Sequence, residues 1–217
     1  MNVEREKQLA AQAAAELVHD SMVVGLGSGS TVAYFLPALA ARGLDLRCVS
    51  TSPATEDAAR RLGIRVETFR GTSALACLDI AIDGADQVEP SGWLVKGGGA
   101  AHTREKAVAA AADRFVVIVS SDKLVERLTP PVPLELLEFG LAATLRRLGT
   151  VRLREAPRSP EGGIIADFTG PFGNPGELAE RLSTTVGVVE HGLFPPAMVS
   201  DIIVARGEQV DLIARSR

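Results

Sequence analysis

Short apolar strand-like segments alternate with helical segments through the first 120 residues of the chain. The expected strands are 21–26, 47–50, 78–82, 93–95 and 114–120, and the expected helices are 3–18, 32–42, 53–62 and 103–112. This alternation predicts β-α-β units, whose strands lie parallel in one sheet with helices packed on its faces. We therefore expect an α/β fold with a doubly wound, mostly parallel sheet of the Rossmann-like type.

A proline-rich segment marks a change of pattern at residues 129–133, where three prolines occupy four positions. Beyond it the expected order is strand, helix, two strands, helix and strand, at 134–137, 140–148, 150–153, 163–168, 175–182 and 186–193. That order is typical of a ferredoxin-like α+β domain. The strands expected at 202–205 and 210–213 would return to the first sheet. The sequence thus predicts a catalytic domain at 1–128 plus 205–217, and a smaller domain at 129–204 inserted before the C-terminus.

The charge balance and aromatic content argue against several classes of partner. The chain has 23 basic and 27 acidic residues among 217, and 4% of its residues are aromatic. A weakly acidic protein with few stacking side chains is a poor candidate for nucleic-acid binding. No apolar run approaches the roughly 18 residues that a membrane span needs, and Cys48 and Cys77 fit a reduced, buried pair. We expect a soluble cytoplasmic protein, with a small anion still open as its ligand.

The first candidate site is the glycine-rich turn G-L-G-S-G-S-T at 25–31, between an expected strand and helix. Backbone N–H groups in such a turn and at the start of the helix favour an anion, and Ser28, Ser30 and Thr31 add hydroxyl donors beside Gly29. The turn lacks the lysine of a Walker A loop and the third glycine of a dinucleotide-binding turn. It suits a phosphate monoester, although an ordinary capped turn remains an alternative.

The second candidate site is D-G-A-D at 83–86, which directly follows an expected apolar strand. Its residues are Asp83, Gly84, Ala85 and Asp86. Two carboxylates three positions apart across a turn can face one cleft, where neighbouring charges push their pKa values in different directions. A solvated turn is the alternative for this motif taken alone.

The third candidate site is K-G-G-G-A-A-H-T-R-E-K at 96–106. Three consecutive glycines, at positions 97–99, cost conformational entropy unless the backbone approaches a partner closely. Glu105 falls in the first turn of an expected helix, where it could serve as a general base or merely as a favourable partner of the helix dipole. Lys96 could stabilise an oxygen that becomes negative during a reaction.

Lysine is rare among the basic residues and occurs at four positions: 7, 96, 106 and 123. Lys123 follows the apolar strand at 114–120 and could reach the same edge of the sheet as the other candidates. Lys7 lies on the first expected helix and could add charge to a phosphate site. The chain has no H-x-x-x-H, C-x-x-C or carboxylate-rich loop, so we expect neither a metal nor an organic cofactor.

These motifs together resemble the ribose-5-phosphate isomerase A family. The resemblance rests on the runs at 25–31, 83–86 and 96–106, on the lysine at 123, and on G-V-V-E-H-G-L-F at 187–194. It implies an isomerase of the pentose phosphate pathway that interconverts ribose 5-phosphate and ribulose 5-phosphate through an enediol without a metal. It also implies a homodimer or homotetramer.

By position, the resemblance implies a role for each candidate residue. Glu105 would accept the proton, with Asp83 and Lys96 as the other catalytic groups. The substrate would be held by the remaining candidates, namely Ser28, Gly29, Ser30, Thr31, Gly84, Ala85, Asp86, Gly97, Gly98, Gly99, Lys123 and Lys7. The chain departs from the family pattern at Gln87, at His102 and at residues 120–122. Two alternatives stay open from the residues: a phosphosugar-binding sensor on the same scaffold, and a nucleotide-dependent Rossmann enzyme, which the missing third glycine disfavours.

Overall fold

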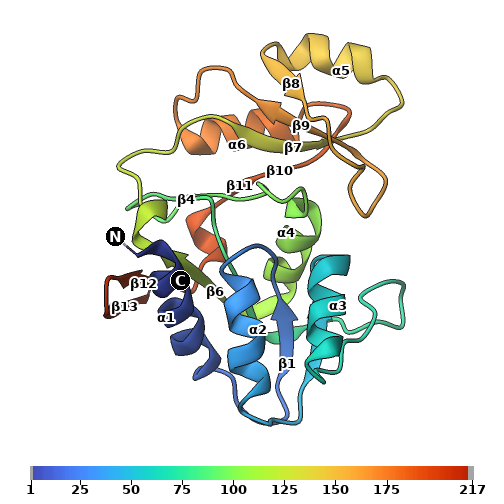
Figure 1. Ribbon diagram of the computed structural model, residues 1–217. Helices are drawn as coiled ribbons and strands as arrows, with labels where there is room; N and C mark the ends of the chain where they lie inside the picture. Colours follow the sequence, from blue (N-terminus) through green and yellow to red (C-terminus); the bar gives the residue numbers. More distant parts are fainter. Residues whose placement is uncertain (1, 215–217) are drawn as a thin grey trace. The chain divides into compact units, whose positions relative to one another are not determined.

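The computed structural model describes residues 2–214, and these form two compact units (Figure 1). The first unit comprises Met1–Ala85, Arg104–Lys123 and Ala197–Arg217, of which Met1 and 215–217 lie outside the described residues. The second unit comprises Asp86–Thr103 and Leu124–Pro196. Residues 86–103 therefore group with the second unit by contacts, whereas the sequence predicts them in the first. As bounds of independently folding domains, 1–128 plus 205–217 for the catalytic domain and 129–204 for the smaller domain stay a prediction.

The first unit is built on a six-stranded sheet in the order β13-β12-β6-β3-β1-β2. Its strands are β1 (Val23–Leu26), β2 (Arg47–Ser50), β3 (Leu78–Asp83), β6 (Ala112–Ser120), β12 (Asp201–Arg206) and β13 (Gln209–Ala214). All neighbouring strands are parallel except β12 and β13, which pair antiparallel. The mostly parallel sheet that the sequence predicts is confirmed.

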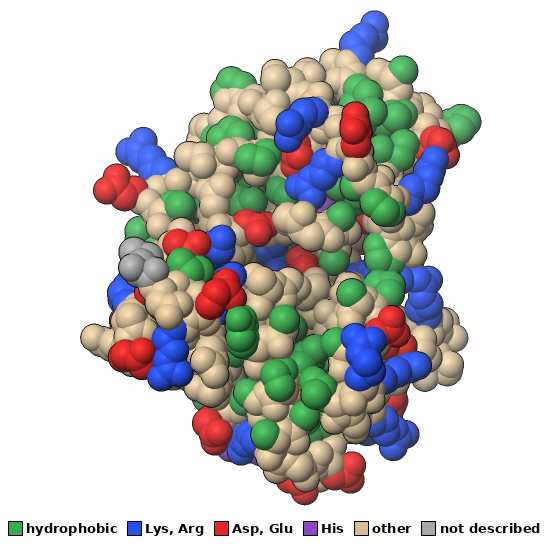
Figure 2. Space-filling model, in the orientation of Figure 1, with side chains coloured by type: hydrophobic (Ala, Val, Ile, Leu, Met, Phe, Trp, Pro, Cys, Tyr) green, Lys and Arg blue, Asp and Glu red, His purple; other side chains and the backbone are tan. Residues whose placement is uncertain are grey.

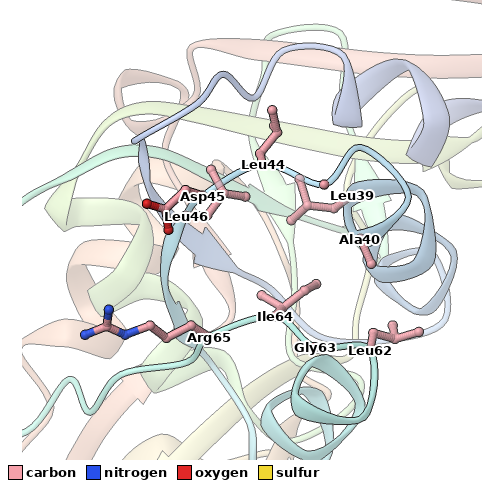
Figure 3. Close-up of a pocket in the computed structure, with 10 residues that line it drawn as sticks. Leu39, Ala40, Leu44, Asp45, Leu46, Leu62, Gly63, Ile64 and Arg65 are labelled. Atoms are coloured by element: carbon pink, nitrogen blue, oxygen red, sulfur yellow. The ribbon is translucent and has the colours of Figure 1, made fainter.

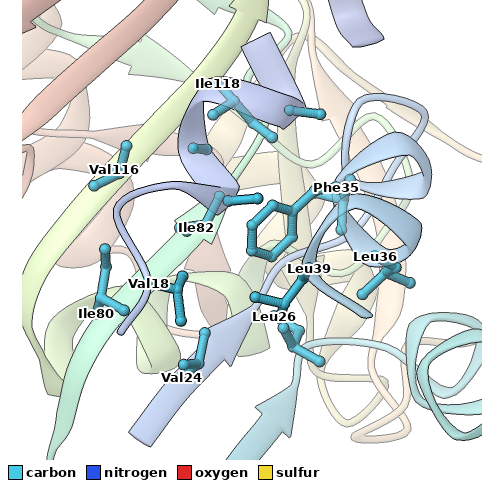
Figure 4. Close-up of a cluster of buried hydrophobic side chains, with 14 of the residues drawn as sticks. Val18, Val24, Leu26, Phe35, Leu36, Leu39, Ile80, Ile82, Val116 and Ile118 are labelled. Carbon is cyan, nitrogen blue, oxygen red and sulfur yellow. The ribbon is translucent and has the colours of Figure 1, made fainter. Parts of the chain in front are cut away.

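Helices cover both faces of this sheet because the strands alternate their side chains between two apolar layers. The helices are α1 (Val3–Ala15), α2 (Val32–Ala40), α3 (Pro53–Arg61) and α4 (His102–Ala111). On one face Leu26 and Ile82 join Phe35 of α2 in a fully buried cluster (Figure 4). On the other face Gly25 lies against Val108 of α4, so closely that a Cβ on Gly25 would come within 2.5 Å of its Cγ1 atom.

The second unit contains an antiparallel sheet in the order β10-β7-β9-β8, flanked by two helices. The elements are β7 (Val132–Leu136), α5 (Leu141–Leu148), β8 (Val151–Leu153), β9 (Ile164–Phe168), α6 (Pro175–Ser183) and β10 (Val188–His191). Strand order and direction are those of a ferredoxin-like α+β fold, as expected. Its core includes Leu134, Phe168 and Leu182, which are fully buried.

A small second sheet in this unit departs from the expected elements. It joins β4 (Gln87–Val88), β5 (Leu94–Val95) and β11 (Leu193–Phe194). The strand expected over 186–193 is therefore two strands, because the chain leaves β7 at Gly192 and continues beside β5. A Cβ on Gly192 would come within 2.1 Å of the Lys96 carbonyl oxygen, so this crossing requires glycine.

Two surface properties bear on the expectations from composition. Basic and acidic side chains are interspersed over the face shown in Figure 2, in keeping with the nearly balanced charge. No helix within residues 2–214 has the length and hydropathy to span a bilayer.

The expectation of two buried cysteines is wrong for one of them: Cys48 is buried in β2, but Cys77 is exposed because it precedes the first residue of β3.

Candidate active site

The turn after β1 packs directly against the end of β3 in the first unit. The amide of Ser28 donates to Oδ1 of Asp83 at 3.0 Å, and the amide of Gly84 donates to the same oxygen at 2.8 Å. A Cβ on Gly27 would lie 2.2 Å from the carboxyl carbon of Asp83, so only glycine permits this approach. The Asp83 side chain is buried and is held by backbone donors from two loops.

Glu105 joins this cluster from the first turn of α4. The hydroxyl of Ser28 donates to Oε1 of Glu105 at 2.6 Å, and Glu105 is 5% exposed. Ser28 therefore contacts one carboxylate through its amide and a second through its hydroxyl. Burial and the hydroxyl donor thus hold the Glu105 carboxylate in one orientation, and its role as a general base stays a prediction.

The same turn ends at the start of α2, where a phosphate is expected. Gly29 adopts a φ of 98°, which favours glycine, and both Gly29 and Ser30 are exposed. Thr31 precedes the first residue of α2, and its side chain makes no capping hydrogen bond. Within α2, the amides of Ala33 and Tyr34 already donate to the carbonyls of Gly29 and Thr31, both at 3.1 Å, so an anion at this helix start would depend on the amides that precede Ala33 and on the helix dipole.

Lys7 is connected to the start of α2 through Glu4. The Nζ atom of Lys7 lies 2.7 Å from one oxygen of Glu4, and the hydroxyl of Tyr34 donates to the other oxygen at 2.7 Å. Tyr34 belongs to the first turn of α2. A two-step chain of hydrogen bonds thus links Lys7 to the first turn of α2, and the role of Lys7 at a phosphate stays a prediction.

Lys123 ends a short 3-10 turn, Ser121–Lys123, that follows β6. The side chain of Lys123 is 34% exposed, and its Nζ atom lies 3.3 Å from the carboxylate of Asp122. The turn is held by Glu6 of α1, a buried residue that the sequence analysis did not identify. Glu6 accepts hydrogen bonds of 2.8 Å from the amide and hydroxyl of Ser121 and from the amide of Gly207.

These donors determine the ionisation of Glu6. The hydrogen bond from Gly207 holds the pKa of the Glu6 carboxyl below its usual value; burial opposes this, and the two bonds from Ser121 reinforce it. Glu6 belongs to the first turn of α1. Its three donors lie far along the chain, so no local pattern signals its burial.

In the second unit, Lys96 is almost fully buried beside β11. Its amide donates to the carbonyl of Gly192 at 2.8 Å, and its Nζ atom lies 5.5 Å from the centre of the Phe194 ring. An ammonium at this distance from an aromatic ring is attracted to the ring face. The G-L-F segment of the late motif therefore holds Lys96 in place.

The glycine loop that follows Lys96 is in contact with Asp86. The amide of Gly98 donates to Oδ2 of Asp86 at 2.8 Å, and a Cβ on Gly98 would come within 2.8 Å of the other Asp86 oxygen. Gly97 has a φ of 102°, and a Cβ there would press on His102, which is fully buried. Three consecutive glycines predict a close approach of the backbone to a partner, and Gly97 and Gly98 make such an approach. A Cβ on Gly99 would meet nothing within 4 Å.

Two of the departures noted in the sequence have structural explanations. Gln87 exchanges hydrogen bonds with the backbone of Thr129, at 2.9 Å in each direction. His102 fills the space beside Gly97 at the start of α4. In the described part of the chain, no three His, Cys, Asp or Glu side chains are grouped so that they could hold a metal ion.

The structure thus assembles the predicted residues in two groups. The first unit joins Ser28, Asp83, Gly84 and Glu105 beside the helix start at Thr31, and the second unit joins Asp86 to the loop at 96–99. Because the D-G-A-D run is divided after Ala85, the shared cleft of its two carboxylates stays a prediction.

A hollow of about 230 Å³ lies elsewhere in the first unit (Figure 3). Its lining includes Leu39, Leu46, Leu62 and Ile64, with Asp45 and Arg65 as its charged residues. These residues lie at the end of α2, in the segment that follows α3, and just before β2. The hollow is therefore at the amino end of the strands, whereas Ser28 and Asp83 are at the carboxyl end, where α/β sheets bind ligands.

The sequence comparisons with known proteins agree on one family. The model of the family described as ribose 5-phosphate isomerase A (phosphoriboisomerase A) matches residues 47–209. A ribose-5-phosphate isomerase A of Caulobacter sp. (strain K31) is 44% identical over 89% of this chain and 91% of its own length.

Solved structures agree with the sequence comparison. The crystal structure of ribose 5 phosphate isomerase A from Neisseria gonorrhoeae superposes with a TM-score of 0.92 at 31% identity, over 100% of this chain and 99% of that one. A structure of D-ribose-5-phosphate isomerase in complex with phospho-erythronic acid also gives 0.92, at 34% identity over 99% and 100% of the two chains.

Proposed function

This chain belongs to the ribose 5-phosphate isomerase A family, and we propose that it interconverts D-ribose 5-phosphate and D-ribulose 5-phosphate by proton transfer through an enediolate. As a member of this family it is an aldose–ketose isomerase, acting in the non-oxidative branch of the pentose phosphate pathway. The observation that carries the mechanism is the buried cluster in which Ser28 contacts both Asp83 and Glu105.

Glu105 is the general base in this proposal. Its carboxylate takes the proton from C2 of the open-chain aldose and returns it to C1, which moves the carbonyl from C1 to C2. A second proton must pass from the hydroxyl on C2 to the oxygen on C1. Asp83 is assigned this transfer because its carboxylate is held by two amides beside the same serine. Both steps are general acid–base catalysis between neighbouring atoms.

Lys96 is assigned to the enediolate oxygen, whose negative charge develops in the transition state. Its burial favours this role, since an ammonium acts more strongly where water is excluded. Asp86, Ala85 and Gly97 to Gly99 would line the reacting end of the sugar, and Lys123 would contact the substrate. The proposal needs neither metal nor cofactor, because a base and a fixed positive charge suffice for this proton transfer.

The phosphate is assigned to the turn at 28–31 and the start of α2, with Lys7 adding positive charge. A relative was solved in complex with phospho-erythronic acid, a ligand that carries a phosphate at one end and a carboxylate at the other, which supports a phosphorylated sugar as the class of ligand. A carboxylate resembles the charge of an enediolate. The same acid is therefore a suitable probe of the site in this protein.

The proposal also includes the assembly and location that the resemblance implies. We expect a homodimer or homotetramer in the cytoplasm, without a nucleic-acid or membrane partner. Light scattering coupled to size-exclusion chromatography measures the mass of the assembly. A mass equal to that of one 22.8 kDa chain would contradict the expected oligomer.

The test of the mechanism is conversion of ribose 5-phosphate to ribulose 5-phosphate by the wild type and by Glu105→Gln, each with and without a chelator. We expect activity that survives chelation and a kcat lower by at least about 10² in the variant. Glu56→Gln is the matched control, since Glu56 also lies in the first turn of a helix but pairs with Arg60 at the surface. Equal rates for Glu105→Gln and wild type would exclude Glu105 as the base, and binding without turnover by wild type would favour the sensor.

A further inference from the structure

The guanidinium of Arg154 binds two consecutive carbonyls of the glycine loop in the second unit. Arg154 directly follows β8, and its Nη1 atom donates to the oxygens of Gly97 and Gly98, both at 3.0 Å. Its side chain is 18% exposed. One side chain that directly follows a strand thus fixes the direction of two peptide units in a run of three glycines, the residue type with the greatest conformational freedom.

Asp167 of β9 orients this guanidinium. Its two oxygens accept from Nε of Arg154 at 2.9 Å and from Nη2 at 2.6 Å, and the Asp167 side chain is 4% exposed. Two parallel hydrogen bonds fix the plane of a guanidinium, so the remaining nitrogen, Nη1, is aimed at the loop. Because its charge is paired with Asp167, Arg154 serves as a rigid donor of hydrogen bonds.

Two further hydrogen bonds, made by amides of the loop itself, also hold the loop. The amide of Gly98 donates to Asp86, and the amide of Ala100 donates to the oxygen of Gly97 at 3.0 Å. In the peptide that links Gly97 to Gly98, Arg154 therefore binds the carbonyl and Asp86 binds the amide. Because these two groups point in opposite directions, the two contacts together determine one orientation for this peptide.

We propose that Arg154 and Asp167 are a positioning pair for the isomerase reaction, which keeps the 96–99 loop in the one conformation that the substrate requires. This inference rests on the proposed function, which assigns Lys96 and the glycines to the reacting end of the sugar. Neither residue is assigned to the substrate: Arg154 acts through the loop, and Asp167 acts through Arg154. A displacement of about 1 Å in a positioning element is sufficient to cost an enzyme on the order of 10² in rate.

The test compares Arg154→Ala with Arg152→Ala. Arg152 lies two positions earlier and is within 3.7 Å of the same Asp167, but its side chain is 76% exposed. We expect Arg154→Ala to lower kcat by about 10 to 10², with a smaller change in KM, and Arg152→Ala to leave both near wild type. Guanidinium chloride at tens of millimolar should restore part of the lost kcat, and sodium chloride at equal ionic strength should not.

Two further measurements separate positioning from folding. Hydrogen exchange should accelerate at the amides of 98 and 100 in Arg154→Ala, while the strands β7 and β9 keep wild-type protection. Arg154→Lys, which keeps the charge but not the paired geometry, should recover less than a tenth of the lost activity. Full recovery by lysine, an unchanged kcat in Arg154→Ala, or unchanged exchange in the loop would each overturn the proposal.

The exchange readout also distinguishes the two proposals. If wild type lacks isomerase activity but Arg154→Ala still accelerates hydrogen exchange in the loop, the function proposal fails, while the structural role of Arg154 in holding the loop is confirmed. If wild type is active and Arg154→Ala is equally active, the positioning proposal fails alone.

Discussion

The hydroxyl of Ser28 lies 2.6 Å from Oε1 of Glu105, although 77 positions separate them in the sequence. The contact joins the turn that would hold a phosphate to the helix that carries the proposed base. In the proposed site, the distance from the phosphate to the base would therefore be determined by the packing of two elements on one sheet. A phosphosugar of fixed length suits such an arrangement.

Removing the Ser28 hydroxyl tests this relationship. We expect Ser28→Ala to lower kcat by roughly 10- to 150-fold, because loss of one hydrogen bond to a charged group costs on the order of 1.5–3 kcal/mol. Ser28→Thr keeps the hydroxyl and should retain more of the activity. Steady-state kinetics of both variants measure the effect, and equal losses in the two would show that the hydroxyl is not the important group.

Lys7 should affect substrate binding more than chemistry. The phosphate does not react, so its contacts stabilise the substrate and the transition state alike. We expect Lys7→Ala to raise KM and the dissociation constant of phospho-erythronic acid by about 10-fold, with kcat within a factor of about three. Arg5→Ala, on the same helix and paired with Glu208 at the surface, is the control. A fall in kcat without a rise in KM would place Lys7 elsewhere in the mechanism.

The buried Glu6 should make stability depend on pH in the acid range. Because the pKa of Glu6 is lower in the folded protein than its ordinary value of 4.5, its contribution is complete above that value. The contribution is lost as the pH falls below 4.5 and through the folded-state pKa. Glu6→Gln should therefore unfold more easily than wild type at pH 7, by about 1–3 kcal/mol, with a smaller difference at pH 3.

Urea denaturation at the two pH values measures this difference. Glu16→Gln is the control, because Glu16 follows the same helix but its side chain is 74% exposed. We expect it to unfold as wild type does at both values. A Glu6→Gln difference that grows on acidification would contradict the lowered pKa.

Gly97 and Gly99, two of the three loop glycines, should differ in how well they tolerate replacement by alanine. Gly97→Ala places a side chain at a φ of 102° and against His102 and Pro133, so it should cost about 1–3 kcal/mol of stability. Gly99→Ala meets no atom within 4 Å and no unusual φ, so its melting temperature should match or exceed that of wild type. Differential scanning calorimetry checks both, and equal melting temperatures would show that the loop is not constrained at Gly97.

The parallel sheet and its site-bearing loops could be predicted because their signals are local. Apolar runs such as β6 and glycine turns such as the one after β1 lie within a few residues of sequence. The two-residue strands β4 and β11 were not predictable, since two residues carry no periodicity. The contact of Arg154 with Gly97 and the burial of Glu6 against Gly207 depend on segments that are distant in the sequence. Nothing in the neighbouring residues distinguishes these charges from ordinary surface ones.

The first unit is built from three separate stretches of chain, and this has a consequence for folding during translation. Strand β6 is completed at Ser120, but its neighbour β12 begins only at Asp201. On the ribosome, residues Leu124–Pro196 of the second unit emerge between these two strands, so the edge of β6 has no partner while about 80 residues are translated. An open apolar edge invites pairing with other chains. Slower translation of the 121–200 segment should therefore increase aggregation of nascent chains, whereas a circular permutant that begins at β12 should avoid the wait.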